Sequence, residues 1–390
     1  MNQESQGSQS AATFPGRASN SSSVHVVHVT EALGGGVLYF LHQLIKAQVE
    51  AGLDVTLVYS VRPDTPVPEM LDQLFPSPVS RVVLHMTTNI SLKADYKSFR
   101  DLAEVLRGLE ADVVHLHSSK AGALGRAAAR FVGLNKRLYY SPHGFAFLRQ
   151  DVSPVKRAIF FVLEVVGGFF GGKIIASSAS EGRLADRLVG HHRVRIVENC
   201  TDVQELAWPE KASDDRVRVI SAGRLCYQKA PWRFWSLSAA LFRENSGFIW
   251  IGDGELRVQL ESNAAQSMVR VTGWIARNDL WREMRAADVF VMTSLWEGMP
   301  LTLLDAQAMG LPAVVPDVVG CRDVVIDEVT GFICKNDGAL IEKTRLLIRD
   351  AELRARMGQA AKSMAVQRFS IGRMHGEMLC AYGLTDRILS

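Results

Sequence analysis

The sequence predicts an α/β protein with two domains that face each other across a cleft. Apolar strand-like segments alternate with helix-like segments over most of the 390 residues, as expected for mostly parallel sheets with both faces covered. The alternation breaks around residues 203–213 and then starts afresh. The length also allows about two or three domains of ~100–200 residues each.

The first series of segments predicts an N-terminal domain over residues 24–202. Its expected strands cover residues 24–29, 55–59, 82–85, 113–117, 138–140 and 173–176. Residues 1–23 before it are rich in Ser, Gln, Asn and Gly and lack the apolar core of a signal peptide. They are expected to form a disordered tail.

After a linker at residues 203–213, a second series predicts a C-terminal domain over residues 214–370. Its expected strands cover residues 217–221, 248–251, 269–272, 289–292 and 313–316. Residues 371–390 predict a helix that could cross back to the N-terminal domain. Because ligands bind beyond the carboxyl ends of the strands in open sheets, two facing domains predict a site between them.

Composition and charge exclude several other classes of protein. The formal charge of +3 is too small to argue for nucleic acid, and the five cysteines are scattered without a C-x-x-C pair, which favours a reducing compartment. The longest apolar run, residues 158–172, contains Glu164 and four glycines and is too short for a span of ~20 residues. We expect a buried helix there, in a protein that is cytoplasmic or peripheral to the inner face of the plasma membrane.

The most informative stretch follows the predicted strand at residues 289–292. Glu297 lies in the turn, Pro300 suits the first turn of a helix, and Asp305 comes eight residues after Glu297. The N–H groups at a helix start suit a phosphate, and the two carboxylates can accept hydrogen bonds from vicinal hydroxyls. A site with both properties indicates a nucleotide-sugar.

Two further loops follow the first strand of each predicted domain. Gly34, Gly35 and Gly36 could let backbone N–H groups approach a phosphate, although a glycine run can also be a simple tight turn. Arg224 and Lys229 could neutralise a departing diphosphate without a metal. Read alone, they could equally form a solvated basic loop.

Histidines and acids give no sign of a metal or a cofactor. His143 follows a predicted strand and could contact a sugar hydroxyl or stabilise developing charge, whereas His115 and His117 favour packing or hydrogen bonding. The chain contains no H-E-x-x-H, no tight His/Asp ligand cluster and no D-x-D, so a metal-bridged diphosphate is not indicated. No lysine stands out as a Schiff-base partner for pyridoxal phosphate.

A basic segment interleaved with aromatic residues lies between residues 113 and 163. It could be a set of ordinary solvated helix faces, or a surface that meets anionic lipid or an anionic acceptor. RNA is less favoured because no RNA-binding motif accompanies it. The basic residues expected at a membrane or acceptor are Lys120, Arg126, Arg149, Lys156 and Arg157.

Taken together, these residues resemble the family-4 retaining glycosyltransferases, which have the GT-B fold of two Rossmann-like domains. The resemblance covers residues 24–370 and rests on Gly223-Arg224-Leu225 with Lys229, Gly252-Asp253-Gly254, Gly273-Trp274, and Glu297-Gly298-Met299-Pro300 through Asp305. The segments at residues 117–126 and 141–145 are similar to bacterial members that extend lipid-linked O-antigen, capsule or exopolysaccharide units.

The resemblance implies a role for each matching position. Arg224 and Lys229 would hold the donor diphosphate, Glu297 and His143 would contact the transferred sugar, and Asp305 would accept the ribose hydroxyls. The remaining donor contacts would come from Gly35, Gly36, Trp274, Ile275, Met299, Leu301 and Thr302.

Three positions depart from the family pattern. Asp305 stands where a glutamate is usual, so its contact with the ribose could be looser or bridged by water. Ala230 replaces a glycine after the lysine, and residues 199–202 read Asn-Cys-Thr-Asp instead of Asn-Gly-x-Asp. We assign no ligand role to residues 199–202.

The function expected from sequence is transfer of a sugar, with retention, from a nucleotide-diphosphate sugar to a polyprenyl-diphosphate-linked saccharide acceptor. UDP is taken as the nucleotide because it is the commonest in this setting, and the resemblance implies a front-face mechanism without a metal. Two alternatives stay open: a GT-B epimerase or phosphorylase, and a non-catalytic subunit that binds nucleotide-sugars in a polysaccharide assembly complex.

Overall fold

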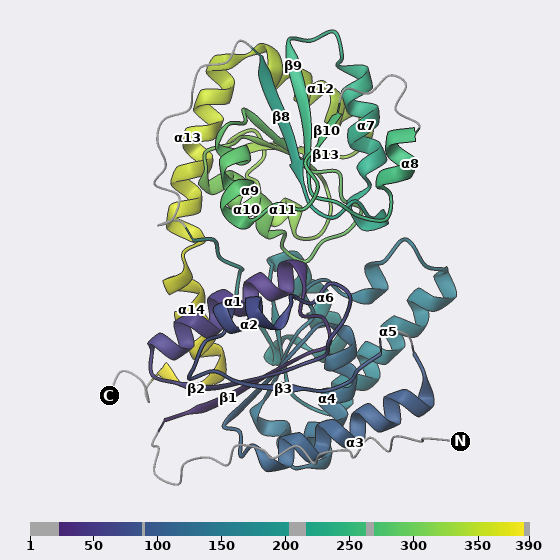
Figure 1. Ribbon diagram of the computed structural model, residues 1–390, viewed down its shortest axis with the longest axis vertical. Coiled ribbons are helices and arrows are strands. Elements are labelled where there is room, and N and C mark those ends of the chain that lie inside the picture. The colour runs from purple at the N-terminus through teal and green to yellow at the C-terminus, as the bar shows by residue number, and fades with distance from the viewer. Residues whose placement is uncertain (1–22, 88–89, 203–215, 263–268, 386–390) are drawn as a thin grey trace, which may run out of the picture.

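Two parallel β-sheets, one in each half of the chain, organise the structure (Figure 1). The computed structural model describes residues 23–87, 90–202, 216–262 and 269–385. The expected tail, apart from Ser23, and the expected linker at residues 203–213 lie outside the described residues. The prediction of an α/β protein with two parallel-sheet domains is confirmed.

The N-terminal sheet orders its described strands β3-β2-β1-β4-β5-β6-β7, all parallel. The strand order reverses between β1 and β4, the kind of position where open sheets bind ligands. The strands are β1 (His25–Thr30), β2 (Asp54–Tyr59), β3 (Ser80–Val83), β4 (Val113–His117), β5 (Leu138–Ser141), β6 (Lys173–Ala176) and β7 (Val194–Ile196). The helices are α1 (Gly35–Glu50), α2 (Pro68–Leu74), α3 (Leu92–Gly108), α4 (Ser119–Phe131), α5 (Pro154–Phe169) and α6 (Ala179–Val189).

The C-terminal sheet repeats this plan in the order β10-β9-β8-β11-β12-β13 and reverses between β8 and β11. Its strands are β8 (Val217–Ala222), β9 (Ser246–Ile251), β10 (Val269–Val271), β11 (Val289–Val291), β12 (Ala313–Pro316) and β13 (Gly331–Cys334). The helices are α7 (Pro231–Ala240), α8 (Arg257–Ser262), α9 (Arg277–Arg285), α10 (Leu301–Ala308), α11 (Cys321–Val324), α12 (Asp337–Arg349) and α13 (Ala351–Arg368). Buried apolar side chains form two clusters against each sheet.

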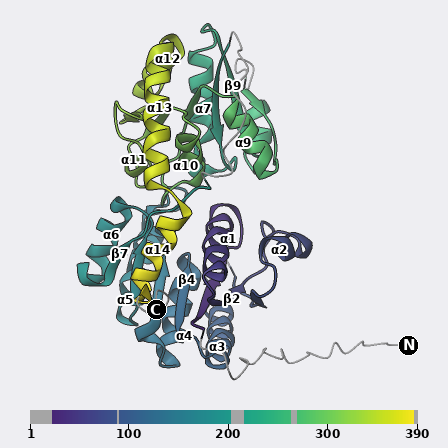
Figure 2. The same ribbon diagram turned by 90° about the vertical axis from the view of Figure 1, so that its left-hand side faces the viewer.

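The last described helix, α14 (Ile371–Tyr382), packs on the N-terminal domain. Figure 2 shows α13 and α14 in yellow, running from the C-terminal domain down onto the N-terminal one. Met374, Met378 and Tyr382 are buried in the same cluster as Phe40 and Leu44 of α1. The end of the chain thereby ties the two halves together through apolar contacts, which the hydrophobic effect stabilises.

Two outermost strands, β7 and β13, were not expected from the sequence. Strand β7 has three residues, two of which are exposed, and β13 begins at Gly331 with a positive φ of 157°. An edge strand has one neighbour, so its residues need not form the long buried run by which a central parallel strand is recognised. Pairing with β6 and β12 completes the two sheets.

The expectation of a buried helix at residues 158–172 was wrong in part. Helix α5 forms there, with Pro154 in its first turn and the Ser153 side chain accepting from the N–H of Lys156. Its buried face, however, is Glu164, Gly167 and Gly168, while its large apolar side chains are exposed. Among the described residues, no helix combines the length and the apolar character that crossing a membrane requires.

Candidate active site

The candidate site lies where the carboxyl ends of the two sheets meet. The turn after β5 touches the turn after β11: a Cβ added to Gly298 would lie 2.7 Å from the Gly144 nitrogen and 2.8 Å from the His143 carbonyl carbon. Since those atoms are backbone, only glycine fits at position 298. The motif at residues 297–300 is thereby held against His143.

Lys229 and Glu297 form the charged centre of this site. Lys229 Nζ lies 2.6 Å from Glu297 Oε1, and both side chains are largely buried. Burial lowers the pKa of Lys229, but the charge and hydrogen bond of Glu297 outweigh it and leave this pKa above its usual range. The lysine is therefore a fixed cation at the end of β8.

The loop after β8 carries both basic residues expected at the site, Arg224 and Lys229. Gly223, at a positive φ of 152°, lies against the Lys229 stem, where an added Cβ would be 3.2 Å from Cε. Arg224 on the same loop is exposed, so its guanidinium can meet a ligand's negative charge. Ala230 adopts the left-handed conformation with φ 44°, a region in which an L-residue is strained.

Two helix starts meet beside these cations. Helices α1 and α10 have no side-chain cap at their N-termini, as far as the described residues show. A Cβ on Gly36 would lie 4.0 Å from Leu301 Cδ1, so the two starts are adjacent. Free N–H groups and the positive ends of helix dipoles suit an anion. Gly35 and Gly36 begin α1, and Leu301 and Thr302 begin α10.

Asp305 is more enclosed than the sequence suggested. It is fully buried, and its carboxylate accepts hydrogen bonds from Thr201 and, at 2.7 and 2.9 Å, from Arg277 Nη2. Burial raises its pKa, an effect that the Arg277 charge opposes. The Arg277 guanidinium also lies 3.5 Å from the ring centre of Tyr39 in α1, and so reaches the other domain.

The segment at residues 199–202 joins the domains at the same place. Asn199 Nδ2 donates to the Met299 carbonyl at 2.8 Å, and Thr201 holds Asp305. Sequence reasoning assigned no role to these residues because their pattern departs from the family. Trp274 is exposed and Ile275 half-buried in the loop after β10, where the resemblance places the base.

His143 lies in a strained turn, which one acidic and one aromatic side chain contact. It has a positive φ of 52°, and Glu181 Oε1 accepts from the following Gly144 N–H at 2.7 Å. The rings of Phe40 and His143 are steeply inclined to each other with their centroids 4.9 Å apart, and burial lowers the pKa of His143 to about 4. No sequence signal pointed to Glu181, because its partners, Ser177 and Gly144, are brought to it by the fold.

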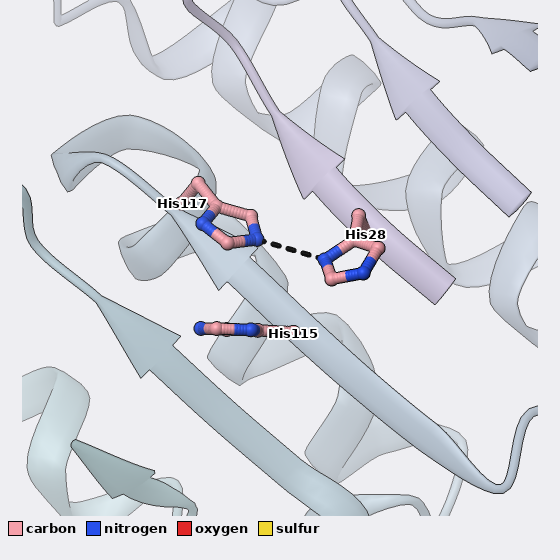
Figure 3. Close-up of side chains that lie close together, drawn as sticks. All are labelled: His28, His115 and His117. Atoms are coloured by element: carbon pink, nitrogen blue, oxygen red, sulfur yellow. Dashed lines mark hydrogen bonds between the residues drawn. The ribbon is translucent and has the colours of Figure 1, made fainter. Parts of the chain in front are cut away.

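The fold also gathers histidines that the sequence keeps apart. His28 of β1 and His115 and His117 of β4 have ring nitrogens within 4.8 Å of one another (Figure 3). The sequence-based view that no tight ligand cluster exists is therefore wrong. All six ring nitrogens contact protein groups, so every ring nitrogen of the cluster has a hydrogen-bond partner within the protein.

The expected membrane residues divide into two groups. Arg126 is 2% exposed, donates to Glu164 at 2.7 Å and stacks on Tyr140. The prediction that Arg126 lies on the basic surface is therefore wrong. Lys120 is largely buried and lies 2.6 Å from Asp95. Lys156 and Arg157 are exposed on α5, while Arg149 is half-buried and paired with Asp151.

Comparisons with known proteins agree with this arrangement. Residues 34–205 match Glycosyltransferase Family 4, and residues 202–364 match Glycosyl transferases group 1. One relative is the Escherichia coli UDP-Gal:alpha-D-GlcNAc-diphosphoundecaprenol alpha-1,3-galactosyltransferase, 31% identical over 73% of this chain and 78% of that protein. Another, from Campylobacter jejuni, is N,N'-diacetylbacillosaminyl-diphospho-undecaprenol alpha-1,3-N-acetylgalactosaminyltransferase, 23% identical over 70% and 77%.

Solved structures share the fold at low sequence identity. HepE of Anabaena, crystallised with UDP and glucose, superposes with a TM-score of 0.75 at 18% identity, covering 92% of this chain and 99% of that one. Sucrose-phosphate synthase of Thermosynechococcus elongatus gives 0.76 at 17% identity, covering 93% and 99%. From its sequence match and its two facing parallel-sheet domains, the chain belongs to the family-4 glycosyltransferases with the GT-B fold.

Proposed function

We propose that the protein transfers a sugar, with retention of its anomeric configuration, from a nucleotide-diphosphate sugar to a hydroxyl of a polyprenyl-diphosphate-linked saccharide. The observation that carries this proposal is the convergence of the Lys229–Glu297 pair, the uncapped start of α10 and His143 at the facing ends of the sheets. Each of these groups suits one part of a nucleotide-sugar.

The donor diphosphate would bind between the two helix starts and the cations of the β8 loop. Lys229 Nζ and the exposed Arg224 would neutralise the charge that develops on the leaving phosphate, with the N–H groups of Met299, Leu301 and Thr302 adding donors. Such preorganised stabilisation is usually the largest part of catalysis. With two fixed cations, the step needs no metal, and the departing phosphate oxygen can take the proton of the attacking hydroxyl.

Asp305 would accept hydrogen bonds from the ribose hydroxyls after the Arg277 side chain moves away from its carboxylate. Both carboxylate oxygens already accept hydrogen bonds from protein groups, so ribose binding would exchange hydrogen bonds rather than add them. Arg277 bridges Asp305 and Tyr39. Its movement would therefore link nucleotide binding to the contact between the domains.

The acceptor and the nucleotide are supported by relatives. The proteins from E. coli and C. jejuni are both named for acceptors on diphosphoundecaprenol, and the first is named for UDP-Gal. We extend an undecaprenyl-type diphosphate acceptor and a UDP donor to this chain. The acceptor would bring the protein to the cytoplasmic leaflet.

Helix α5 is the surface proposed to meet that leaflet. It exposes Phe161, Val162 and Phe169, the last at 84%, beside the exposed Lys156 and Arg157. The helix faces its neighbours with Gly167 and Gly168, which lie against Arg126 and Val189, so its large apolar side chains point outward. An apolar helix face with basic neighbours suits an anionic membrane surface.

A ligand screen followed by product analysis tests the proposed function. UDP-, GDP-, ADP- and dTDP-sugars are compared by thermal shift, where a ligand at 100 times its dissociation constant should stabilise by about 2.7 kcal/mol. The donor found is then incubated with a short-chain polyprenyl-diphosphate saccharide, and the anomer formed is read by NMR. Failure of every nucleotide-sugar to bind would contradict the proposal. Conversion of the nucleotide-sugar to a different sugar in the absence of acceptor would indicate an epimerase. Binding of the nucleotide-sugar without turnover on the acceptor would indicate a non-catalytic subunit.

Vesicle co-sedimentation tests the membrane surface. Phe161→Ser with Phe169→Ser should weaken binding to anionic vesicles, and Lys156→Ser with Arg157→Ser should remove its dependence on anionic lipid and salt. Phe242→Ser, at a 57% exposed position of the C-terminal domain, is the matched control. Equal binding of all variants, or none to any vesicle, would contradict this surface.

A further inference from the structure

Three aromatic side chains, Tyr227, Trp232 and Trp296, form a cluster beside the Lys229–Glu297 pair. The Tyr227 ring centroid lies 5.1 Å from that of Trp232, in the first turn of α7, and 6.5 Å from that of Trp296. Tyr227 is 44% exposed, Trp232 36% and Trp296 9%. Single exposed aromatic residues are common, whereas a cluster of them marks a binding surface. We call these three side chains the aromatic face.

The aromatic face and the charged pair are carried by the same two loops. Tyr227 comes two residues before Lys229 in the loop after β8, and Trp296 directly precedes Glu297 in the loop after β11. Gln228 joins the loops, because its side-chain Nε2 donates to the Trp296 carbonyl at 2.9 Å and lies 3.4 Å from Glu297 Oε2. A ligand group on the aromatic face is therefore held next to the charged pair.

The N-terminal domain meets one of these loops through the segment that leads into α5. Gln150 lies four residues before α5 begins at Pro154, and its Nε2 donates to the Leu295 carbonyl at 3.1 Å. Leu295 directly precedes Trp296. Figure 1 shows α5 and α7 on the same side of the molecule, one in each domain. The aromatic face is thus bordered by the charged pair on one side and by the approach to α5 on the other.

The chemistry of the aromatic face favours a sugar ring. The C–H groups on one side of a pyranose carry partial positive charge, which suits the negative face of an aromatic ring. The hydroxyls around the pyranose need polar partners, and Tyr and Trp present a polar tip beside an apolar body. A purely apolar ligand would leave these tips without a partner.

The position of the aromatic face distinguishes an acceptor sugar from the donor sugar. The donor diphosphate is expected at the start of α10, on residues that follow Glu297. Trp296 and Leu295 precede Glu297 and lead away from α10 to Gln150. A second sugar that approaches Glu297 from the side of α5 would pass along these residues.

We propose that Tyr227, Trp232 and Trp296 form a subsite that binds a sugar ring of the acceptor by stacking and holds it next to Glu297. That this sugar belongs to a lipid-linked acceptor rests on the proposed function, whereas binding of a sugar ring to the aromatic face does not. Because stacking requires no particular hydroxyl, the subsite should bind several related pyranoses.

Saturation-transfer NMR on the full-length protein tests the subsite directly. The probes are the methyl α-glycosides of glucose, galactose, N-acetylglucosamine and N-acetylgalactosamine, and we expect transfer to their ring C–H protons. Tyr227→Ala and Trp232→Ala should each weaken binding by about threefold to tenfold, the value of one aromatic contact. Tyr227→Phe keeps the ring and should bind as the native protein does.

The control and the choice of variants follow from exposure. Phe242→Ala removes a 57% exposed aromatic side chain from the same domain and should leave glycoside binding unchanged. Trp296 is left intact because its replacement would open a largely buried position. Circular dichroism checks the fold of each variant. Lack of transfer to every glycoside, or equal binding by the native protein and both alanine variants, would overturn the proposal.

Kinetics assign the bound sugar to the acceptor once the donor is known. Tyr227→Ala and Trp232→Ala should raise the KM for a short-chain polyprenyl-diphosphate saccharide by about threefold to tenfold and leave the donor KM unchanged. A rise in the donor KM alone would overturn the proposal, as would loss of vesicle binding with an unchanged acceptor KM. Because glycoside binding needs no nucleotide, lack of turnover with every nucleotide-sugar would count against the proposed function alone.

Discussion

Mild acid should destabilise the protein strongly through four histidines whose pKa values are lowered by burial. In the native state His28, His115, His117 and His143 resist protonation because burial lowers their pKa, whereas the unfolded chain takes up protons near the ordinary value of 6.5. Their contribution to stability is therefore complete above pH 6.5. It is lost as the pH falls from there towards the lowered pKa, about 4 for His28 and His143.

The size of the effect follows from the number of groups. At pH 5.5, one unit below the ordinary pKa, each histidine held neutral costs about 1.4 kcal/mol, so four together cost about 6 kcal/mol. Glu31, Glu181 and Asp305 act in the opposite direction, because burial raises the pKa of their carboxyls. We therefore expect a net loss of about 3–5 kcal/mol between pH 7.5 and 5.5, which is large against typical stabilities of about 5–15 kcal/mol.

Urea unfolding at the two pH values measures this loss directly. His28→Gln should reduce the difference between the two pH values by about 1.4 kcal/mol, the share of one histidine. His191→Gln removes an imidazole that is exposed and is not one of these four, and serves as the control. Free energies of unfolding that agree within about 1 kcal/mol at the two pH values would contradict the burial of neutral histidines.

Three further predictions concern the site and its support. Lys229→Ala should lower turnover by about 10²–10³-fold, and the activity of the native protein should be insensitive to EDTA. Complete loss of native activity in EDTA, restored by Mn²⁺, would contradict charge neutralisation by Arg224 and Lys229 alone. Gly298→Ala should destabilise by about 1–3 kcal/mol and lower activity, because its Cβ meets backbone at 2.7 Å, whereas Gly247→Ala has nothing within 4 Å and is the control in both measurements. Asp305→Ala should raise the donor KM more than Asp305→Glu, and an unchanged KM in folded Asp305→Ala would remove Asp305 from the ribose site.

Much of the site could be predicted because its parts are local. Glu297, Pro300 and Asp305 lie on one strand–turn–helix unit, and Arg224 and Lys229 lie on one loop. In a parallel sheet every strand ends at the same edge, so residues that follow different strands are brought together by the alternation itself. The alternation of elements and the motifs that follow the strands were therefore sufficient for the fold class and for the set of candidate residues.

The tertiary structure decided which faces are covered and which polar groups are paired. The apolar run of α5 suggested a buried helix, but Glu164, Gly167 and Gly168 face inward because Arg126 and Val189 need that space. The histidine network combines positions 28, 115, 117 and 143 with Gln48 and Tyr382 from the two ends of the chain. Periodicity determines a helix or a strand within a short window, whereas burial and hydrogen-bond direction depend on residues far apart in sequence, which only the packed fold brings into contact.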